Sequence, residues 1–325
     1  MHIDSIFDIV TTTAFEEMAL AIFRMQYAEN SVYREFCRYL DATPANVLQL
    51  TDIPFLPIGF FKSKEIISEE KKSEIIFTSS GTTGSLTSKH LVSDLRVYEK
   101  SFRKAFAHFY GDIKEYCVLA LLPSYLEREG SSLIYMVDDL IQKSGHEKSG
   151  FYLDNLEGLK DQLTQLEAAG TETLLIGVSF ALLDMVEKHP IKLENTIIME
   201  TGGMKGRRKE LIREELHQLL KSGFGVSNIH SEYGMTELLS QAYSKGNGNF
   251  ETPPWMKIMI RDTEDPMTYQ PIGKTGGMNI IDLANINSCA FIATQDLGKL
   301  HQDGSFEILG RFDHSDVRGC NLMVL

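Results

Sequence analysis

A run of small polar residues follows an apolar segment in the first third of the chain. After Ile76 and Phe77, the stretch 79–84 reads Ser79, Ser80, Gly81, Thr82, Thr83 and Gly84. Small residues let backbone N–H groups approach an anion closely, and the hydroxyls donate further hydrogen bonds. Lys89, a little further along, adds a positive charge that suits phosphate oxygens. The GxxxxGK(S/T) pattern of a Walker A loop does not occur, so the run predicts either another kind of phosphate loop or a solvated polar connection.

Four further polar segments follow the run along the chain. They are Gly202, Gly203, Met204 and Lys205; Glu232, Tyr233, Gly234, Met235, Thr236 and Glu237; Asp296, Leu297 and Gly298; and residues 310–319, which begin with Gly310 and Arg311. In this order the five segments resemble the motifs of the adenylate-forming superfamily, which includes acyl-CoA synthetases and luciferases. The resemblance covers residues 60–320. The resemblance depends on all five segments occurring in this order, because each motif alone is short enough to arise by chance.

The resemblance implies ATP and Mg²⁺ as cofactors, held partly by the polar run. Residues 79–84 would hold the ATP phosphates, and Lys89 would add a charge, although it lies further from the second glycine than the lysine of the family does. Thr236 would contact the α-phosphate. Glu237, with Thr82, would place Mg²⁺, which offsets the charge that develops on pyrophosphate.

The resemblance also assigns residues to the nucleoside. Gly202 and Gly203 would form the turn on the adenine side, and Tyr233, followed by Gly234, would stack near adenine. Asp296 would accept hydrogen bonds from the ribose hydroxyls, and Arg311 would add a charged contact. Without that context, the segment around Tyr233 is typical of an ordinary turn, and Asp296 of a loop acid that caps the backbone.

Within the superfamily, the chain is most similar to the LuxE-like acyl-protein synthetases. The similarity extends to the proline-bounded segment 53–62 and to a cysteine near the C-terminus, Cys320. Members activate a fatty acid as acyl-AMP and take the acyl group onto that cysteine before passing it to a partner protein. A thiolate attacks an acyl-adenylate readily. The alternative for Cys320 is a small buried hydrophobe in a terminal strand.

The remaining cysteines and a histidine have simpler interpretations. Cys37, Cys117 and Cys289 are scattered among apolar residues, which argues against a zinc module or a disulfide scaffold and favours structural roles in a reducing compartment. His230, just ahead of the Tyr233 motif, either lines an acyl pocket or is a satisfied core histidine.

Short apolar runs alternate with amphipathic segments over most of the chain. This alternation predicts an α/β fold with mainly parallel strands flanked by helices, and a smaller β-rich lobe with short strands after about residue 250. Strands are expected at 75–78, 116–122, 173–178, 196–201, 226–230 and 256–260, and helices at 94–109, 131–143, 156–169, 181–188 and 207–221, with two more helices in the first fifty residues.

The resemblance identifies this pattern as the large N-terminal domain of an adenylate-forming enzyme. The expected divisions are a helical segment at 1–60, an α/β adenylation core at 61–250, a β-rich lobe at 251–309, and a hinge-like motif with a tail at 310–325. The small C-terminal lid domain of the superfamily, which carries a catalytic lysine, is expected to be absent.

The composition limits the possible partners. The 325 residues include 32 Lys+Arg and 45 Asp+Glu, so the formal charge of -13 argues against broad binding to nucleic acid or anionic membranes. The N-terminus lacks a basic start followed by a long apolar run, and no stretch approaches the roughly 20 apolar residues that span a bilayer. A cytoplasmic location is therefore expected.

Three functions fit these residues. The first is an acyl-protein synthetase that activates a carboxylic acid, expected to be a fatty acid, and passes the acyl group through Cys320 to a reductase or carrier protein. The second is a CoA ligase or stand-alone adenylating enzyme that delivers the acyl group to CoA or a carrier. The third is a non-catalytic subunit that binds an acyl group or a nucleotide.

Overall fold

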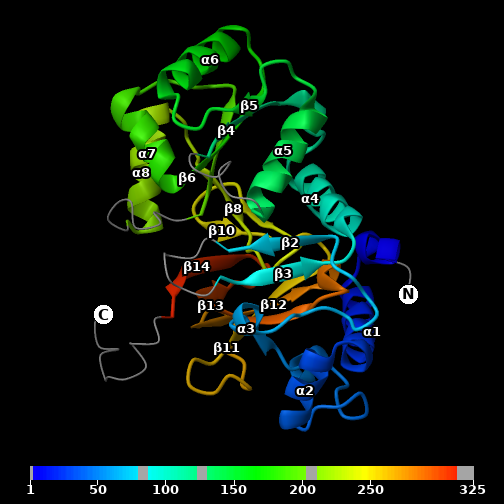
Figure 1. Cartoon of the computed structure of the whole chain (residues 1–325). Coiled ribbons are helices and arrows are strands. Elements are labelled where there is room, and N and C mark those ends of the chain that lie inside the picture. The colour runs from blue at the N-terminus through cyan, green and yellow to red at the C-terminus, as the bar shows by residue number, and fades with distance from the viewer. Residues whose placement is uncertain (1–2, 80–86, 123–129, 203–210, 313–325) are drawn as a thin grey trace. The chain divides into compact units, whose positions relative to one another are not determined.

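The computed structural model describes residues 3–79, 87–122, 130–202 and 211–312 (Figure 1). Its contacts divide the chain into two compact units. The β-rich unit joins Met1–Ile76 and Gly81–Asp94 to Pro254–Leu325, and the α/β unit consists of Phe77–Ser80 and Leu95–Pro253. Each unit is therefore assembled from stretches that are separated in the sequence.

The α/β unit is built on a sheet with the strand order β5-β4-β6-β7-β8-β9. Neighbouring strands are parallel from β5 to β8, and β9 is antiparallel to β8. β4 and β6 are buried along their whole length, as expected for central strands with both faces covered. The strands are β4 Cys117–Leu121, β5 Gly150–Phe151, β6 Thr173–Val178, β7 Thr196–Thr201, β8 His230–Tyr233, β9 Ala242–Ser244 and the short β10 Asn249–Phe250.

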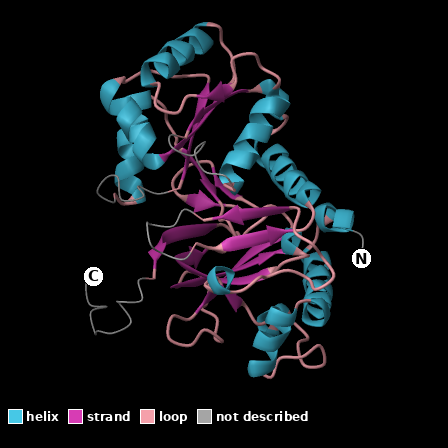
Figure 2. Cartoon of the chain, viewed as in Figure 1, coloured by secondary structure: helices cyan, strands magenta, loops and turns pink. Residues whose placement is uncertain are grey.

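Helices pack in pairs against this sheet (Figure 2). α7 and α8 lie side by side, and so do α4 and α5. Local signals define the helix ends: Ser131 and Asn155 cap the starts of α5 and α6, and Gly145 and Gly225 end α5 and α8 in the left-handed conformation that glycine adopts at little cost. The helices are α4 Leu95–Tyr110, η3 Ile113–Glu115, α5 Ser132–Ser144, α6 Leu156–Ala168, α7 Ser179–Lys188 and α8 Arg213–Phe224.

The β-rich unit is an antiparallel sheet in which β11, β12, β13 and β14 follow one another. The proline-bounded segment contributes β1, which pairs in parallel with β13. The start of β2 pairs with β3. The strands are β1 Leu56–Pro57, β2 Ile75–Thr78, β3 Lys89–Val92, β11 Met256–Arg261, β12 Thr275–Asp282, β13 Phe291–Leu300 and β14 Phe306–Arg311. The helices are η1 Ile3–Asp8, α1 Thr12–Glu29, α2 Ser31–Tyr39, η2 Leu50–Asp52, α3 Phe60–Ser63 and η4 Leu283–Asn285.

A buried amide joins the N-terminal helices to the strands of this unit. Gln26 in α1 donates from Nε2 to the carbonyls of Asn285 and Ile286, both at 2.9 Å, and accepts from the Ala290 N–H at 3.0 Å. Buried polar groups are stable in a core only when they are hydrogen-bonded in this way. The start of the chain and a segment 260 residues further on therefore fold together.

Most of the predicted elements are confirmed, and two predictions are wrong. The strand expected at 226–230 begins four residues late: β8 spans His230–Tyr233, and its polar residues pair with the end of β7. The strands after residue 250 are not all short, since β13 has 10 residues. Gly276 and Gly277 lie inside β12; a Cβ at Gly277 would stand 2.5 Å from Arg261 Cζ, so only glycine leaves room for that guanidinium.

Among the helices in the described part of the chain, none is long and apolar enough to cross a membrane.

Candidate functional site

Two of the predicted motifs lie at the carboxyl ends of neighbouring strands in the α/β unit. β7 runs into Gly202, and β8 ends at Tyr233, followed by Gly234. The two strands are parallel, with Thr201 facing Glu232 in the ladder. In open α/β sheets this edge is where ligands bind. The structure thus brings together the predicted adenine-side turn and the Tyr233 motif, which are 30 residues apart in the sequence.

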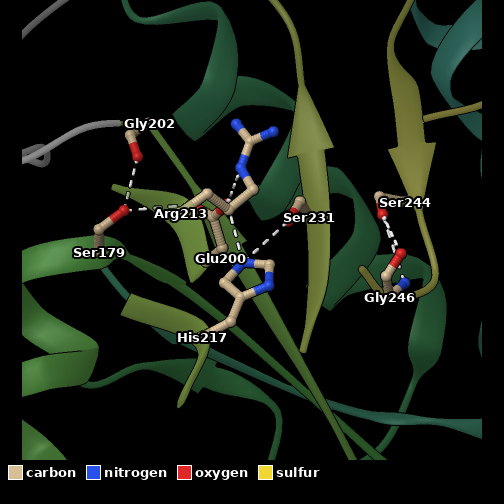
Figure 3. Close-up of polar contacts among 8 residues, drawn as sticks. All are labelled: Ser179, Glu200, Gly202, Arg213, His217, Ser231, Ser244 and Gly246. Atoms are coloured by element: carbon tan, nitrogen blue, oxygen red, sulfur yellow. Dashed lines mark hydrogen bonds and ion pairs between the residues drawn. The ribbon is translucent and has the colours of Figure 1, made fainter. Parts of the chain in front are cut away.

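A buried carboxylate, Glu200, organises the face of the sheet below this edge. His217 Nε2 lies 3.6 Å from Glu200 Oε1, and Arg213 Nε lies 3.8 Å from the same oxygen. Ser231, which faces Glu200 in the ladder, has its hydroxyl 3.5 Å from His217 Nε2. Ser179, the first residue of α7, approaches the other carboxylate oxygen at 3.1 Å. Figure 3 shows these five residues, which we call the Glu200 cluster, converging from β7, β8, α7 and α8.

The Glu200 cluster stabilises a buried negative charge. Burial by itself raises the pKa of Glu200, but hydrogen bonding from His217 and the positive charge of Arg213 outweigh it, so the net shift is downward. Glu200 is therefore ionised at neutral pH. Its partners offset much of the free-energy cost of burying the Glu200 charge. Removing one partner would leave the remaining charged groups incompletely paired.

The ring of Tyr233 reaches the same cluster through a second aromatic residue. Tyr233 lies edge-on to Phe250, with ring centroids 6.1 Å apart. The guanidinium of Arg213 sits over the other ring, 4.8 Å from the Phe250 centroid. Aromatic and cation–π contacts of this kind fix the orientation of a ring. The Tyr233 side chain is thus linked to Glu200 by way of Phe250 and Arg213.

The opposite face of the sheet holds a second buried acid, Glu232. It accepts a hydrogen bond from the Thr201 hydroxyl. Burial raises the pKa of Glu232 to about 7, against the opposing effect of that hydrogen bond and with a further contribution from the charge of Glu200. A Cβ at Gly234 would stand 2.6 Å from Glu232 Oε1. Any larger residue at this position of the motif would therefore crowd the carboxyl group two residues before it.

His230 lies at the other end of β8 and is half-buried. Its Nδ1 is 3.2 Å from the hydroxyl of Tyr110 in α4. Burial, with a contribution from the charge of Lys245, lowers the pKa of His230 to about 4. The ring is therefore neutral at pH 7, and it has a polar partner within the unit.

Thr236 and Glu237 follow Gly234 in the connection between β8 and β9. Glu237 is buried and Thr236 is half-buried, and both side chains take part in interactions. Within the described residues, no group of three or more acidic, histidine or cysteine side chains is arranged to hold a metal ion. A carboxylate such as Glu237 still provides the hard oxygen ligand that Mg²⁺ takes when phosphate oxygens complete its shell.

The predicted ribose residue and its neighbour meet in the β-rich unit. Asp296 in β13 faces Arg311 in β14, and Arg311 Nε donates to Asp296 Oδ1 at 3.0 Å. The side chain of Asp296 is 6% exposed, whereas that of Arg311 is 77% exposed. Lys89, the first residue of β3, belongs to the same unit and is exposed.

A buried arginine supports the strand that carries Asp296. Arg261 in β11 donates to the carbonyls of Met278 at 2.7 Å and Thr294 at 2.6 Å. The Thr294 hydroxyl in turn accepts from the Asp296 N–H at 3.1 Å. Arg261 thus ties β11, β12 and β13 together directly beside the predicted ribose residue.

Several predicted site residues lie outside the described part of the chain: Ser80, Gly81, Thr82, Thr83, Gly84, Gly203 and Cys320. Ser79 is described and belongs to the α/β unit. Sequence reasoning missed the whole Glu200 cluster. The available signal was a glutamate near the end of an otherwise apolar strand, because a charge in a buried strand needs partners from elsewhere in the fold.

Comparison with known proteins places these features in a family. A family model described as "Acyl-protein synthetase, LuxE" matches residues 11–114 and 148–325. The chain belongs to the LuxE acyl-protein synthetase family. The matched residues include every motif named above, so the resemblance inferred from the sequence is confirmed. No curated protein matches the chain.

The fold is that of adenylate-forming ligases. An open conformation of 2-hydroxyisobutyryl-CoA ligase is similar over 93% of this chain and 75% of its own, with a TM-score of 0.63 and 11% identity. ATP-bound MatB from Rhodopseudomonas palustris is similar over 73% of this chain, with a TM-score of 0.55 and 18% identity. A luciferase-like enzyme from the mealworm Zophobas morio has a TM-score of 0.52 and 16% identity, over 78% of this chain and 60% of its own. The chain spans about half of MatB, 47% of its length.

Proposed function

We propose that this member of the LuxE family activates a carboxylic acid, of the fatty acid class, with ATP and then carries the acyl group on Cys320. The observation that carries the proposal is the family match, which runs through the polar run, Gly202, the Tyr233 motif, Asp296 and the tail. The position of Gly202 and Tyr233 at one sheet edge supports it, because both are expected at adenine.

In the first step, the carboxylate oxygen of the acid attacks the α-phosphorus of ATP, and pyrophosphate leaves. Two anions must meet, so the reaction depends on neutralising and aligning them. Residues 79–84, Lys89 and Thr236 are the proposed phosphate contacts. The ATP-bound state of MatB, a protein of the same fold, supports ATP as the nucleotide.

Mg²⁺ is the proposed metal, with Glu237 and Thr82 as ligands. When bound, it would offset the negative charge on the pyrophosphate leaving group. The protein's own part is to hold the nucleoside, with Tyr233 and Gly202 at the base, and Asp296 and Arg311 at the ribose.

In the second step, the thiolate of Cys320 attacks the acyl carbonyl carbon, a thioester forms, and AMP leaves. The acyl group then passes to a nucleophile on a partner such as a reductase or carrier protein. The three described cysteines are poor candidates for this attack, since all are buried. Burial raises the pKa of Cys37 to about 12 and also raises the pKa values of Cys117 and Cys289.

The adenylation step is tested by exchange of labelled pyrophosphate into ATP, with a panel of short, long and aromatic acids. The proposal predicts exchange that depends on the acid and is greatest with long alkyl chains. Nucleotide binding with no acid-dependent exchange would instead indicate a non-catalytic binding subunit.

A second candidate is a ligase that hands acyl-AMP to CoA or a carrier thiol. It is favoured by the likeness to 2-hydroxyisobutyryl-CoA ligase, whose structure was determined with 2-HIB-AMP and CoA. Product analysis separates the two functions. Free acyl-CoA accumulates only if CoA is the acceptor, whereas the main proposal predicts acyl-protein with no requirement for CoA.

A further inference from the structure

The Glu200 cluster holds the backbone at the start of the predicted adenine-side turn. The Ser179 hydroxyl lies 2.7 Å from the carbonyl oxygen of Gly202 and 3.1 Å from Glu200 Oε2, so its single proton is shared between two acceptors. Gly202 has a φ of +68°, the left-handed region that glycine adopts at little cost. Its carbonyl lies just beyond the end of β7, where the Ser179 hydroxyl donates to it.

The same carboxylate also fixes the ring expected to stack on adenine. Arg213 contacts Glu200 on one side and the face of Phe250 on the other, and Phe250 meets the edge of Tyr233. Two separate lines of contact therefore run from a single buried charge: a polar one to Gly202, drawn in Figure 3, and an aromatic one to Tyr233.

We propose that Ser179 and Glu200 are positioning residues for the nucleotide, which hold Gly202 and Tyr233 in the arrangement that receives the adenine base. The inference rests on the proposed function for the identity of the nucleotide. Neither residue touches the reacting atoms, so their loss should weaken ATP binding without abolishing the chemistry.

The chain offers a matched control for Ser179. Ser244, the last residue of β9, is also buried, and its hydroxyl donates to the carbonyl of Gly246 at 3.0 Å. Gly246 likewise has a positive φ, of +149°. Removal of either hydroxyl leaves a glycine carbonyl without its serine donor in the same unit, but only Ser179 contacts Glu200 (Figure 3).

The test compares Ser179→Ala, Ser179→Cys and Ser244→Ala in the full chain. The alanine variant removes the donor, and the cysteine variant keeps a side chain in the space but donates weakly. The dissociation constant for ATP with Mg²⁺ is measured by calorimetry, and KM for ATP and kcat are measured by pyrophosphate exchange. Both Ser179 variants should weaken ATP binding by about tenfold, the effect of one lost hydrogen bond, with kcat reduced much less. Ser179→Thr, which keeps the hydroxyl, should restore most of the affinity.

Unfolding temperatures separate positioning from simple destabilisation. Ser179→Ala and Ser244→Ala should both lower the unfolding temperature, but only Ser179→Ala should reduce the upward shift that saturating ATP produces in the wild type. An ATP affinity that changes no more in the Ser179 variants than in Ser244→Ala overturns the inference. A wild-type protein that does not bind ATP would also overturn the inference.

Failure of this inference and failure of the proposed function give different results. If the wild type binds ATP but shows no exchange, the proposed reaction fails while the binding comparison still tests the two residues. If exchange is present and Ser179→Ala has normal ATP affinity, the inference fails and the reaction stands.

Discussion

Arg311 donates its Nε–H to Oδ1 of Asp296, 3.0 Å away, from the facing position of the β13–β14 ladder. The exposed guanidinium thus orients a carboxylate that is almost entirely buried. A carboxylate held in this way is suited to accept hydrogen bonds from a pair of neighbouring hydroxyls. Arg311 lies nine residues before Cys320 in the sequence.

If Asp296 accepts from the ribose hydroxyls, the protein should distinguish ATP from 2′-deoxy-ATP. The wild type should bind the deoxynucleotide about tenfold more weakly, because a hydrogen bond to a charged acceptor is lost. Asp296→Asn should bind ATP more weakly and lose most of the discrimination. Calorimetry with both nucleotides measures this, with Glu264→Gln as a control in the same unit. Full discrimination in Asp296→Asn would show that the ribose is held elsewhere.

The raised pKa of Glu232 predicts a particular dependence of stability on pH. The folded protein binds this proton more tightly than the unfolded chain does, so the stabilisation is present below the unfolded pKa and is lost as pH rises through about 7. As pH rises from the unfolded pKa to about 7, the loss of this contribution should lower the free energy of unfolding by on the order of 3 kcal/mol. Glu232→Gln should remove that part of the slope, in urea titrations from pH 4 to pH 8. Glu251→Gln, at an exposed carboxylate, should leave the slope unchanged.

Gly234→Ala should be destabilising because of its contact with Glu232. The added methyl would stand 2.6 Å from Glu232 Oε1, so one of the two must move. The expected cost is about 1–3 kcal/mol of unfolding free energy, the usual effect of overpacking. Gly150→Ala provides the comparison, since a Cβ there meets nothing within 4 Å. If the contact is the cause, Gly234→Ala should cost much less in a Glu232→Ala background.

The α/β pattern was predictable because β4, β6 and β7 are continuous apolar runs between amphipathic helices. The start of β8 was not predictable, since His230, Ser231 and Glu232 form its ladder with β7 despite their polarity. Their partners come from elsewhere: Thr201 bonds Glu232, and His217 contacts Ser231. A local sequence pattern cannot predict these partners, because they depend on which strands and helices become neighbours in the fold.

The candidate site could be proposed from the sequence only where its residues form contiguous motifs. Tyr233, Gly234 and Asp296 became candidates in this way. Ser179 and Glu200 were not, because their relation to Gly202 exists only after α7 has packed beside β7. For the same reason, the sequence did not predict which segments of the chain form the β-rich unit, since β1 pairs with β13 across more than 230 residues.

Transfer of the acyl group from AMP to Cys320 is the step that defines the proposed function. Incubating the protein with radiolabelled fatty acid, ATP and Mg²⁺, and measuring the label retained after denaturation, tests this step. We expect ATP-dependent label that hydroxylamine releases and that Cys320→Ser abolishes, while acid-dependent pyrophosphate exchange continues in that variant. Undiminished hydroxylamine-labile label on Cys320→Ser would contradict it.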